Sequence, residues 1–375
     1  MIVKKKLKIV HFTQFLGIGG LEKIIFELSL KQIEQGHDVT VVVYDYERSW
    51  VDFFKSKGIK VKTSFKKNMG FDPRLIMKFK SYLHEERFDI VQTHDINPLI
   101  YLSGVKLLKL LKNQKNFKLI HTTHTLDHIE NSKKIEFFEK TISRIADQIV
   151  TVSPRIKTFY IKKAFLSPSK VHLIENGISL KSPCTENMAK IKKLIYEKEK
   201  LKADLPLGLC LSRIVPLKDQ EFLIKAFLKR PELQLIIVGP PSDKIYFEKL
   251  KKLLKDNPSQ NVRLLGPRTE VVELNKMTNF YLSASTHEGL PVSVLEAMSL
   301  GNPCLVSNIS GHKVLNKYEE VVDTYQLGDQ KDFLRKLDFL TKNLQKEKYQ
   351  RGQIIVDKYF SINKMTARYS QVYNL

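Results

Sequence analysis

The stretch Ser283–Ser307, SASTHEGLPVSVLEAMSLGNPCLVS, is the most informative part of this 375-residue chain. It predicts the end of a β-strand, a tight turn, a short helix and a second strand. Pro291 suits the first position of that helix, because the missing N–H group of proline costs little there. Gly301 follows the last apolar residue of the helix, where a glycine commonly ends a helix.

Two carboxylates lie in this stretch: Glu288 in the loop before the helix, and Glu296 inside the apolar helical segment. A buried carboxylate without a partner is unfavourable, so we expect Glu296 to have a fixed partner. The helix N-terminus beside Glu288 favours an anion, because its free N–H groups and its dipole attract negative charge. The turn can therefore hold a phosphate next to two carboxylates that bind hydroxyl groups, which is the outline of a nucleotide-sugar site.

The wider pattern E-G-L-P-x-x-x-x-E-A-M-x-x-G-x-P resembles the E-x7-E region of retaining glycosyltransferases with the GT-B fold, in particular glycosyltransferase family 4. The resemblance implies that Glu288 binds hydroxyls of the donor sugar and that Glu296 binds the ribose. Gly289, Leu290 and Pro291 would complete this donor-binding turn. The alternative is a helix cap at Glu288 and a core glutamate at Glu296.

Strand-like and helix-like segments alternate along the rest of the chain, which is typical of doubly wound parallel sheets. Strands are predicted at residues 7–12, 39–43, 59–63, 88–93, 119–124, 148–153 and 171–174, and then at 207–211, 233–238, 262–265, 280–284 and 304–307. Residues 179–203 read as a linker or interdomain segment.

Together with the resemblance, this order predicts the α/β GT-B fold, in which two Rossmann-like domains face a cleft. We expect an N-terminal acceptor-side domain at 1–178 and a C-terminal nucleotide-sugar-binding domain at 179–355. The C-terminal helix, 356–375, is expected to pack back on the first domain.

Two cations lie in the segment LSRIVPLKD, residues 211–219. Arg213 follows a strand and Lys218 precedes a helix, so the two can grip a diphosphate and stabilise charge on the leaving group. The segment resembles the G-R-[LI]-x-x-x-K-G signature of the family, with Ser212 and Asp219 in place of its glycines. Asp219 can also cap the following helix. A pair of solvated loop cations is the alternative.

Glycines follow two later strands of this half. At Gly239 the chain continues as Pro240-Pro241, which is stiffer than the glycine-rich turn of the family and puts a direct ligand role there in doubt. The resemblance implies that Gly266 frames the pocket of the nucleotide base. Because the family binds the base through its main chain here, the side chains do not reveal which base is bound.

In the first half, Gly19 and Gly20 lie between the first strand and the first helix, where glycines let a ligand approach the backbone. They resemble the G-G-x-E loop that lies over the donor diphosphate in the family, with Glu22 as its acid. A plain strand-to-helix turn is the alternative.

Two histidines of this half end strands at the carboxyl edge of the predicted sheet, where ligands of open α/β sheets bind. His124 corresponds to a catalytic-site histidine of the family, near the donor sugar and the acceptor hydroxyl. His94 is predicted to contact the acceptor as well. His121, on the same strand as His124, is expected to be structural.

The chain is strongly basic, with a formal net charge of +23. Residues 1–180 hold 31 basic and 18 acidic side chains and the remainder holds 32 and 22, so the excess is not confined to a tail. Such charge favours an anionic membrane surface or polymer; solvated lysine-rich faces are the alternative, and no nucleic-acid motif is present. The candidate membrane-facing side chains are Lys66, Lys67, Arg74, Lys78 and Lys80.

The absence of a long apolar run and of a disulfide spacing among Cys184, Cys210 and Cys304 favours the cytoplasm, with peripheral association at the inner membrane face. No metal-ligand spacing is present, so we expect neither a metal nor a cofactor.

The resemblance implies transfer of a sugar from a nucleotide-sugar, with UDP as the expected nucleotide, to a hydroxyl of a glycan or lipid-linked cell-envelope acceptor, with retention at the anomeric carbon. His124, Arg213, Lys218 and Glu288 would carry the reaction. The alternatives are a nucleotide-sugar epimerase or hydrolase of the same architecture, and a non-catalytic protein that binds anionic surfaces.

Overall fold

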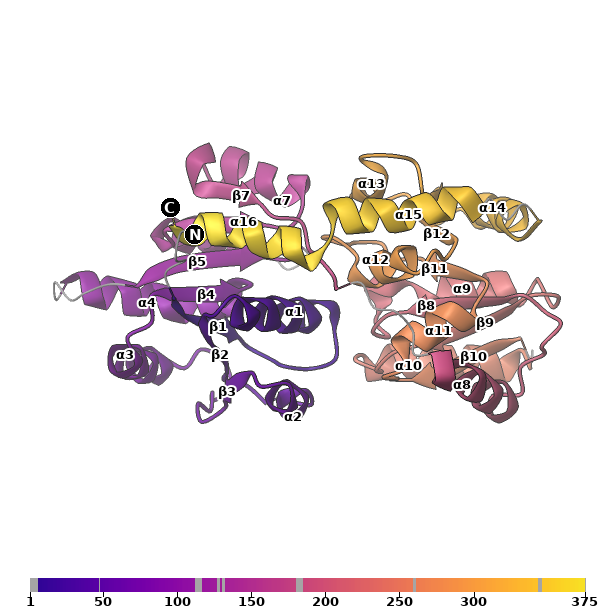
Figure 1. Cartoon of the computed structure of the whole chain (residues 1–375), viewed down its shortest axis with the longest axis horizontal. Helices are drawn as coiled ribbons and strands as arrows, with labels where there is room; N and C mark the ends of the chain where they lie inside the picture. Colours follow the sequence, from indigo (N-terminus) through magenta and orange to yellow (C-terminus); the bar gives the residue numbers. More distant parts are fainter. Residues whose placement is uncertain are drawn as a thin grey trace. The chain divides into compact units, whose positions relative to one another are not determined.

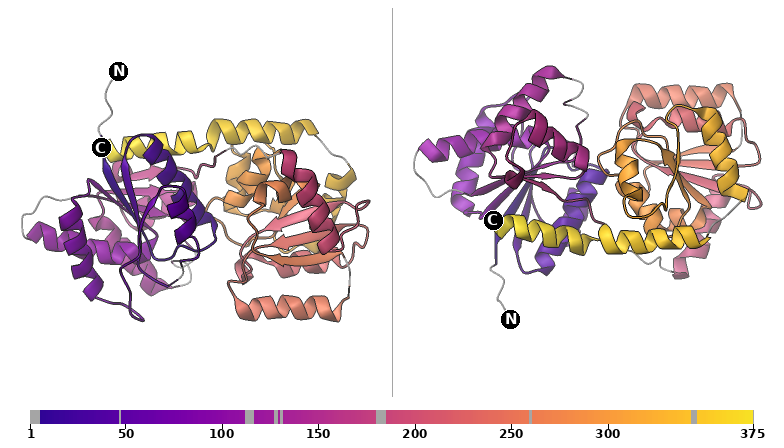
Figure 2. Two further views of the ribbon diagram at one scale, coloured as in Figure 1. Left: turned by 60° about the horizontal axis from the view of Figure 1, so that its bottom comes forward. Right: turned by 90° about the horizontal axis from the view of Figure 1, so that it is seen from above.

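The computed structural model describes residues 6–46, 48–111, 117–126, 129, 132–179, 185–258, 261–342 and 346–374, so Cys184 lies outside the described residues. The chain divides into two compact units. One consists of Met1–Gly177 with Ile362–Leu375, and the other of Ile178–Ser361 (Figure 1). Each unit is a parallel sheet with helices on both faces, as the sequence predicted (Figure 2).

The first unit contains a seven-stranded sheet in the order β3-β2-β1-β4-β5-β6-β7, with every neighbouring pair parallel. Its strands are β1 (Lys8–Thr13), β2 (Asp38–Val43), β3 (Lys60–Lys62), β4 (Ile90–His94), β5 (Lys118–Thr123), β6 (Gln148–Thr151) and β7 (Val171–Leu173). Its helices are α1 (Gly20–Glu34), α2 (Val51–Ser56), α3 (Arg74–Glu86), α4 (Ile96–Leu111), α6 (Lys133–Ile142), α7 (Pro154–Thr158) and α16 (Ile362–Asn374).

The second unit contains a six-stranded parallel sheet in the order β10-β9-β8-β11-β12-β13. Its strands are β8 (Leu207–Leu211), β9 (Gln234–Val238), β10 (Val262–Gly266), β11 (Phe280–Ser283), β12 (Cys304–Ser307) and β13 (Asp323–Tyr325). Its helices are α8 (Thr185–Lys198), α9 (Gln220–Phe227), α10 (Lys244–Asp256), α11 (Val271–Met277), α12 (Val292–Ser299), α13 (Ser310–Lys313), α14 (Gln330–Lys342) and α15 (Lys346–Tyr359).

The central strands of both sheets are buried on both faces, which explains their continuous apolar runs. All residues of β9, QLIIV, are buried, and DVTVVV of β2 is buried after its first residue. The segment expected to be a linker contains α8, which packs against α11 within the second unit.

Each sheet has a point where the chain reverses its direction of winding. In the first unit β1 lies between β2 and β4, and in the second β8 lies between β9 and β11. At such a point the loops that follow two neighbouring strands run to opposite faces of the sheet. Ligands of open α/β sheets bind in the crevice between these loops. The loops after β1 and β4, and those after β8 and β11, are therefore the places for ligand-binding side chains.

The C-terminal helix packs on the first unit against α1 (Figure 2). Lys118 Nζ at the start of β5 donates a hydrogen bond to Val372 O of α16, at 3.0 Å. The helix that was expected to begin at residue 356 begins at Ile362, because α15 continues to Tyr359 and residues 356–361 belong to the second unit.

The helix of the opening stretch, α12, ends as its sequence predicted. Gly301 has a φ of +76°, its N–H donates to Met298 O at 3.0 Å, and Asn302 N donates to Ala297 O at 3.0 Å. This pair of bonds is the Schellman motif, which needs a left-handed residue that glycine adopts without strain. The helix begins one residue later than expected, because Pro291 precedes it as the N-cap, with φ −78° and ψ 101°.

Within the described residues, no helix combines the length and the apolar character needed to cross a membrane.

Candidate active site

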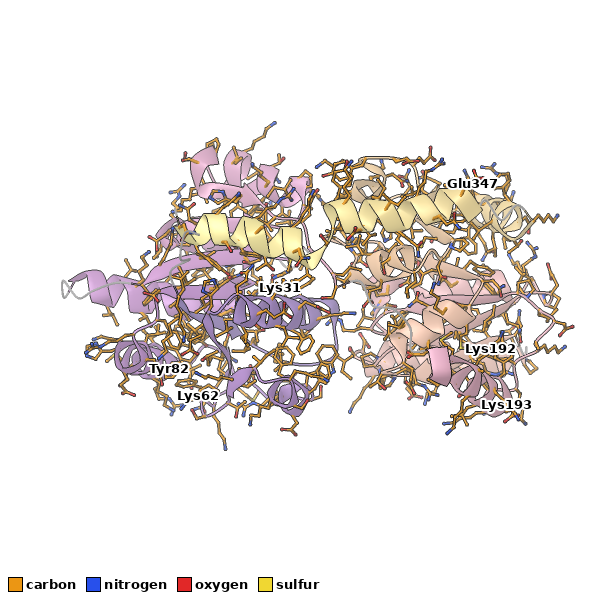
Figure 3. The ribbon with its side chains drawn as sticks, viewed as in Figure 1. Lys31, Lys62, Tyr82, Lys192, Lys193 and Glu347 are labelled. Carbon is orange, nitrogen blue, oxygen red and sulfur yellow. The ribbon has the colours of Figure 1, made fainter. Side chains whose placement is uncertain are left out.

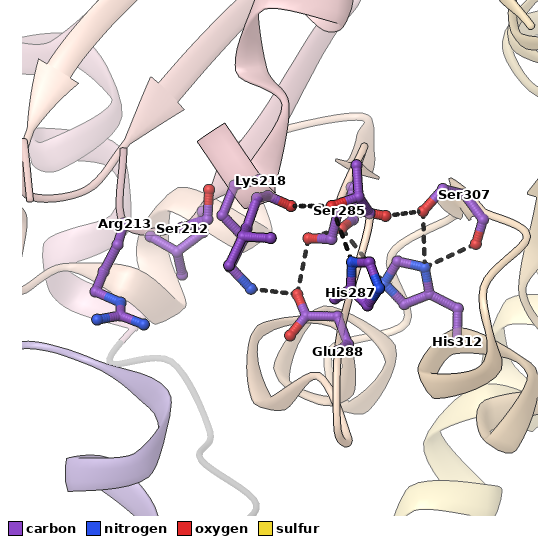
Figure 4. Close-up of polar contacts among 12 residues, drawn as sticks. Ser212, Arg213, Lys218, Ser285, His287, Glu288, Ser307 and His312 are labelled. Carbon is purple, nitrogen blue, oxygen red and sulfur yellow. Dashed lines mark hydrogen bonds and ion pairs between the residues drawn. The ribbon is translucent and has the colours of Figure 1, made fainter. Parts of the chain in front are cut away.

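Lys218 and Glu288 meet at the reversal point of the second sheet. Lys218 ends the turn that follows β8, and Glu288 lies in the loop that follows β11. The two loops are joined by a backbone bond in which Thr286 N donates to Leu217 O at 2.9 Å. Lys218 Nζ donates to Glu288 Oε1 as an ion pair (Figure 4). Two of the predicted site residues are therefore in direct contact.

The carboxylate of Glu288 has a second donor in Ser285, whose hydroxyl bonds to Oε1 at 2.7 Å. The Glu288 side chain is 16 % exposed, so a ligand can still reach it. Burial by itself would raise the pKa of Glu288, but Lys218, His312 and the Ser285 hydroxyl together hold it below the usual value. Glu288 is thus a carboxylate at neutral pH and an acceptor for sugar hydroxyls.

A buried histidine, His312, supports the loop that contains Glu288. Its Nδ1 donates to Ser307 O at 2.8 Å, and its Nε2 lies 3.4 Å from Ser283 Oγ, which in turn lies 3.2 Å from Ser285 Oγ (Figure 4). Burial lowers the pKa of His312 to about 4, so the ring is neutral. The sequence reasoning missed this residue, although it follows β12 at the same sheet edge.

Close packing fixes the residue next to His312. A Cβ atom placed on Gly311 would lie 2.4 Å from Glu288 O. Only glycine fits such an approach without a shift of the backbone. Gly311 therefore allows the Glu288 loop to pack closely against α13. In the sequence, this need for a residue without a Cβ atom appeared only as a glycine after β12.

Arg213 is exposed and has no carboxylate partner among the residues that the structure describes. Its backbone is fixed by Gln220, whose Nε2 donates to Arg213 O at 2.8 Å and to Ser212 Oγ at 2.9 Å. In Figure 4 Lys218 lies between Arg213 and Glu288, so the three charged groups form the order cation, cation, carboxylate.

Gly239 braces the Arg213 loop. A Cβ atom on Gly239 would lie 1.9 Å from Ser212 O, and its φ is +153°. Ile214 N also donates to Pro240 O at 2.9 Å. The Gly239-Pro240 turn therefore supports the cation loop through its backbone, a structural role that does not require ligand contact.

Asp219 occupies the position of the second glycine in the family signature. It has a left-handed backbone, with φ 43° and ψ 48°, and its Oδ1 accepts from Phe222 N at 3.3 Å. The predicted N-cap role is confirmed. Asp and Asn tolerate the left-handed region better than other residues that have a Cβ atom, which explains how an aspartate can replace the glycine here.

Glu296 differs from the expectation of a buried core residue. It is half-buried on α12, in line with the half-buried Ser293 and Ser299, at helical spacings of three residues. This spacing puts Glu296 on a half-buried stripe of α12, whereas the buried stripe contains Val294, Leu295, Ala297 and Met298. A half-exposed carboxylate is accessible to a ribose, and its binding role stays a prediction.

The remaining donor-side residues lie near the same sheet edge. Leu290 is buried and Gly289 is half-buried in the loop before α12. Pro291 gives α12 no side-chain cap, which leaves the first-turn N–H groups uncapped by that residue. Gly266 ends β10 with a φ of +67°, and open space surrounds its Cβ position. Base binding at Gly266 stays a prediction.

In the first unit, Gly19 is the N-cap of α1 and Gly20 is its first residue. A Cβ atom on Gly19 would lie 2.4 Å from Glu22 Oε2. The Glu22 side chain thus folds back over Gly19, an approach that glycine permits. The loop follows β1 at the reversal point of the first sheet, where the sequence placed a phosphate-binding turn.

His124 and His94 lie next to each other at the carboxyl edge of the first sheet, with His94 Nδ1 3.1 Å from His124 Nε2. His94 is 2 % exposed, and its Nε2 lies 3.1 Å from His11 Nδ1. Both ring nitrogens of His94 are therefore engaged in this conformation, and direct acceptor binding by His94 stays a prediction.

Asp95 is a further residue at this edge that sequence reasoning did not identify. Its φ is +64°, and its Oδ1 accepts from His124 N at 3.0 Å. It fixes the backbone from which the His124 ring extends. No sequence signal distinguishes this aspartate from an ordinary residue after a strand.

His121 takes a structural position. Its Nε2 lies 3.1 Å from Glu139 Oε1, its Nδ1 lies 3.0 Å from Thr93 Oγ1, and the rings of His121 and Tyr160 pack edge to face. His121 is completely buried. Among the described residues, no group of three or more His, Cys, Asp and Glu side chains is arranged to hold a metal ion.

Comparisons with known proteins agree with this geometry. The family model described as Glycosyltransferase Family 4 matches residues 18–182, and that described as Glycosyl transferases group 1 matches residues 192–353. Together the two models cover most of the chain. The protein therefore belongs to the family 4 glycosyltransferases of the GT-B fold and is a glycosyltransferase.

Among curated relatives, the UDP-Gal:alpha-D-GlcNAc-diphosphoundecaprenol alpha-1,3-galactosyltransferase of Escherichia coli is 24% identical over 348 residues, covering 88% of this chain and 87% of the relative. Among solved structures, Alr3699/HepE of Anabaena in complex with UDP and glucose superposes with a TM-score of 0.84 at 18% identity, covering 98% of this chain and 99% of the other. A glycosyltransferase of Rickettsia africae gives a TM-score of 0.82 at 17% identity, with 98% of both chains covered.

Proposed function

We propose that this glycosyltransferase transfers a sugar from a UDP-sugar to a hydroxyl of a lipid-linked cell-envelope glycan, with retention at the anomeric carbon. The observation that carries the proposal is the order of charges at the reversal point of the second sheet. Arg213 and Lys218 are suited to a diphosphate, and Glu288, bonded to Lys218, is suited to the hydroxyls of the adjoining sugar.

The two cations would stabilise the negative charge that develops on the diphosphate as the bond between the anomeric carbon and the phosphate oxygen breaks. The acceptor oxygen would form the new bond on the same face, and its proton would pass to the departing diphosphate. On this view the basic side chains take the part that a metal ion has in other transferases. Turnover is then expected to persist after treatment with EDTA.

The choice of UDP and of a lipid-linked acceptor rests on the relatives. The Escherichia coli relative is named for UDP-Gal and a diphosphoundecaprenol acceptor, and the Anabaena structure contains UDP and glucose. The proposed location is the cytoplasmic face of the membrane, where such acceptors and nucleotide-sugars meet.

The experiment that tests this function is a panel of nucleotide-sugars offered with a polyprenyl diphosphate-linked acceptor. UDP release together with a new α-linked product, identified by the anomeric coupling in its NMR spectrum, supports the proposal. Epimerisation of the UDP-sugar without an acceptor favours the epimerase alternative. Absence of UDP binding in a thermal-shift assay contradicts the assignment of a UDP-sugar as the donor.

We also propose that the first unit contacts anionic membrane through the segment before α3. The basic charge is spread over both units, as the labelled Lys31 and Lys62 of the first unit and Lys192 and Lys193 of the second illustrate (Figure 3). It does not by itself select a face. Met69 and Phe71, which lie in sequence between Lys67 and Arg74 of the predicted basic patch, are 101 % and 60 % exposed, so apolar side chains project beside these cations.

The predicted basic patch is only partly available there. Lys66 and Lys78 are exposed, whereas Lys67 Nζ lies 3.5 Å from Asp45 Oδ2. Arg74 Nε lies 2.9 Å from Asp72 Oδ1. Lys80 is half-buried. Exposed lysines around projecting apolar side chains suit an anionic membrane surface. The lysines can contact anionic headgroups, and the apolar side chains can enter the boundary between headgroups and acyl chains.

Sedimentation with liposomes of anionic and neutral lipid tests this surface. Binding to anionic liposomes is expected to fall about tenfold when Met69 and Phe71 are both replaced by serine. The matched control is Ile245→Ser, because Ile245 is 86 % exposed on the second unit. Equal binding to neutral liposomes, or an equal loss in the control, contradicts this surface.

A further inference from the structure

A chain of buried polar side chains runs from His124 to α1 inside the first unit. His124 Nε2 lies 3.1 Å from His94 Nδ1, and His94 Nε2 lies 3.1 Å from His11 Nδ1. His11 Nε2 lies 2.8 Å from Gln32 Oε1. The four side chains come from the edge of β5, from β4, from β1 and from α1, and none is more than 9 % exposed. Their hydrogen bonds are therefore made to one another rather than to bulk water.

The C-terminal helix, α16, orients Gln32, the last residue of this hydrogen-bonded series. Gln32 Nε2 donates to Tyr373 Oη at 2.7 Å, and the Tyr373 hydroxyl donates to Gln92 Oε1 at 2.6 Å. Gln92 Nε2 in turn donates to Thr122 Oγ1 at 2.9 Å. With its amide nitrogen held by Tyr373, Gln32 presents its oxygen to His11.

The three imidazoles are neutral at physiological pH. Burial lowers the pKa of His11 to about 4, and it lowers the pKa of His94 well below its ordinary value. Burial also lowers the pKa of His124, although Asp95 opposes that shift. His121 is the other titratable group that acts on His94 and His124, and it disfavours a charge on either. A neutral imidazole has one N–H group and one acceptor nitrogen.

The direction of each hydrogen bond in this series follows from its last acceptor, Gln32 Oε1. A carbonyl oxygen only accepts, so His11 must have its proton on Nε2, which makes His11 Nδ1 an acceptor. His94 must then donate from Nε2 and accept at Nδ1, and His124 must donate from Nε2. We propose that this relay, anchored by Tyr373 through Gln32, fixes His124 as the Nε2–H tautomer and leaves its Nδ1 unprotonated for a substrate hydroxyl.

This inference rests on the proposed function for the identity of the hydroxyl. An acceptor hydroxyl would donate to His124 Nδ1 when the acceptor binds, which orients the lone pairs of the attacking oxygen, and its proton would pass from this hydrogen bond to the departing diphosphate as the new bond forms. The opposite tautomer would present an N–H group and could not accept that bond. His94, His11, Gln32 and Tyr373 are thus positioning residues that act on the acceptor through His124.

The direct test is the tautomer itself, measured by two-bond ¹H–¹⁵N NMR spectra of the full chain labelled in its histidines. The His124 signals are assigned by their loss in His124→Asn. The expected result at pH 7.5 is a protonated Nε2 and an unprotonated Nδ1 for His124. A protonated Nδ1 or a doubly protonated ring overturns the proposal, whatever the activity of the protein.

The kinetic test compares two substitutions that each remove one buried tyrosine hydroxyl from the first unit. Tyr373→Phe removes the anchor of Gln32 and is expected to produce a mixture of His124 tautomers and a five- to twentyfold lower kcat. Tyr44→Phe is the control, because the buried Tyr44 hydroxyl has no hydrogen-bond partner among the described residues. An unchanged tautomer in Tyr373→Phe, or equal losses of kcat in both variants, overturns the relay.

Binding of UDP separates this inference from the proposed function. Both tyrosine variants are expected to keep the KM for the UDP-sugar within twofold, because their substitutions lie outside the second unit. A wild-type protein that has the predicted tautomer but neither binds UDP nor transfers a sugar would retain the relay and refute the proposed function.

Discussion

Lys218 and Glu288 are joined by an ion pair although 70 residues separate them in the sequence. The contact exists because β8 and β11 are neighbours in the second sheet, so the loops that follow them leave the same edge at adjacent positions. The cation of one family motif thus holds the carboxylate of the other. The first two predictions concern the charged groups of these two motifs.

Replacement of Arg213 by alanine is expected to lower kcat at least 100-fold, because the variant removes a charge that stabilises the leaving diphosphate. The Arg213 side chain is exposed, so the thermal stability should change little. Steady-state kinetics of UDP release measure the effect. Arg335→Ala is the control, since Arg335 is an exposed arginine of α14 in the same unit. A loss of less than tenfold would argue against a diphosphate at Arg213.

Lys218 and Glu288 should have separable effects on ligand binding. Lys218→Met is expected to weaken UDP binding about tenfold or more, because it removes a cation that contacts the diphosphate. Glu288→Gln should leave UDP affinity within about threefold but weaken binding of the UDP-sugar, since only the sugar contacts Glu288. Calorimetric titration with UDP and with a non-hydrolysable UDP-sugar distinguishes the two. Equal losses for both ligands in Glu288→Gln would contradict a sugar contact.

Asp219 is expected to be replaceable by asparagine but not by alanine. Asparagine tolerates the left-handed backbone and can accept the bond from Phe222 N. Alanine lacks the cap and is strained at a φ of +43°, so Asp219→Ala should lose about 2 kcal/mol of unfolding free energy. Urea denaturation measures both variants. Glycine should fall between them, because it relieves the strain and lacks the side-chain cap. A neutral Asp219→Ala would show that neither feature stabilises the loop.

The neutral, buried His312 should make the second unit less stable in acid. Burial lowers the pKa of His312 to about 4 in the folded protein, whereas an unfolded histidine has a pKa of about 6.5. As pH falls from about 6.5 towards 4, the unfolded chain takes up a proton that the folded chain does not, so the free energy of unfolding decreases. At about 1.4 kcal/mol for each pKa unit, the loss amounts to roughly 3 kcal/mol.

The measurement is chemical denaturation at pH 7.5 and pH 5, followed through a probe in the second unit. His312→Asn can still donate to Ser307 O but cannot take up a proton. It should therefore show a smaller difference in stability between the two pH values than the wild type does. An identical pH dependence in the two proteins would mean that His312 is not the group that titrates.

The sequence by itself determined the architecture of this protein, because parallel strands that are buried on both faces have continuous apolar runs, which can be recognised in the sequence. It also determined the end of α12 at Gly301 and the cap at Asp219, which depend on local backbone preferences. The charged groups Arg213, Lys218 and Glu288 could be read from motif spacing.

Only the tertiary structure decided which of these groups touch. Strand order brought Lys218 to Glu288, and it brought His11, His94 and His124 from three neighbouring strands into one hydrogen-bonded chain. It also showed Glu296 half-exposed and revealed His312, Asp95 and Tyr373 as supports. These relationships were not visible in the sequence, because they depend on contacts between residues tens to hundreds of positions apart, whereas a motif reports only its own neighbours.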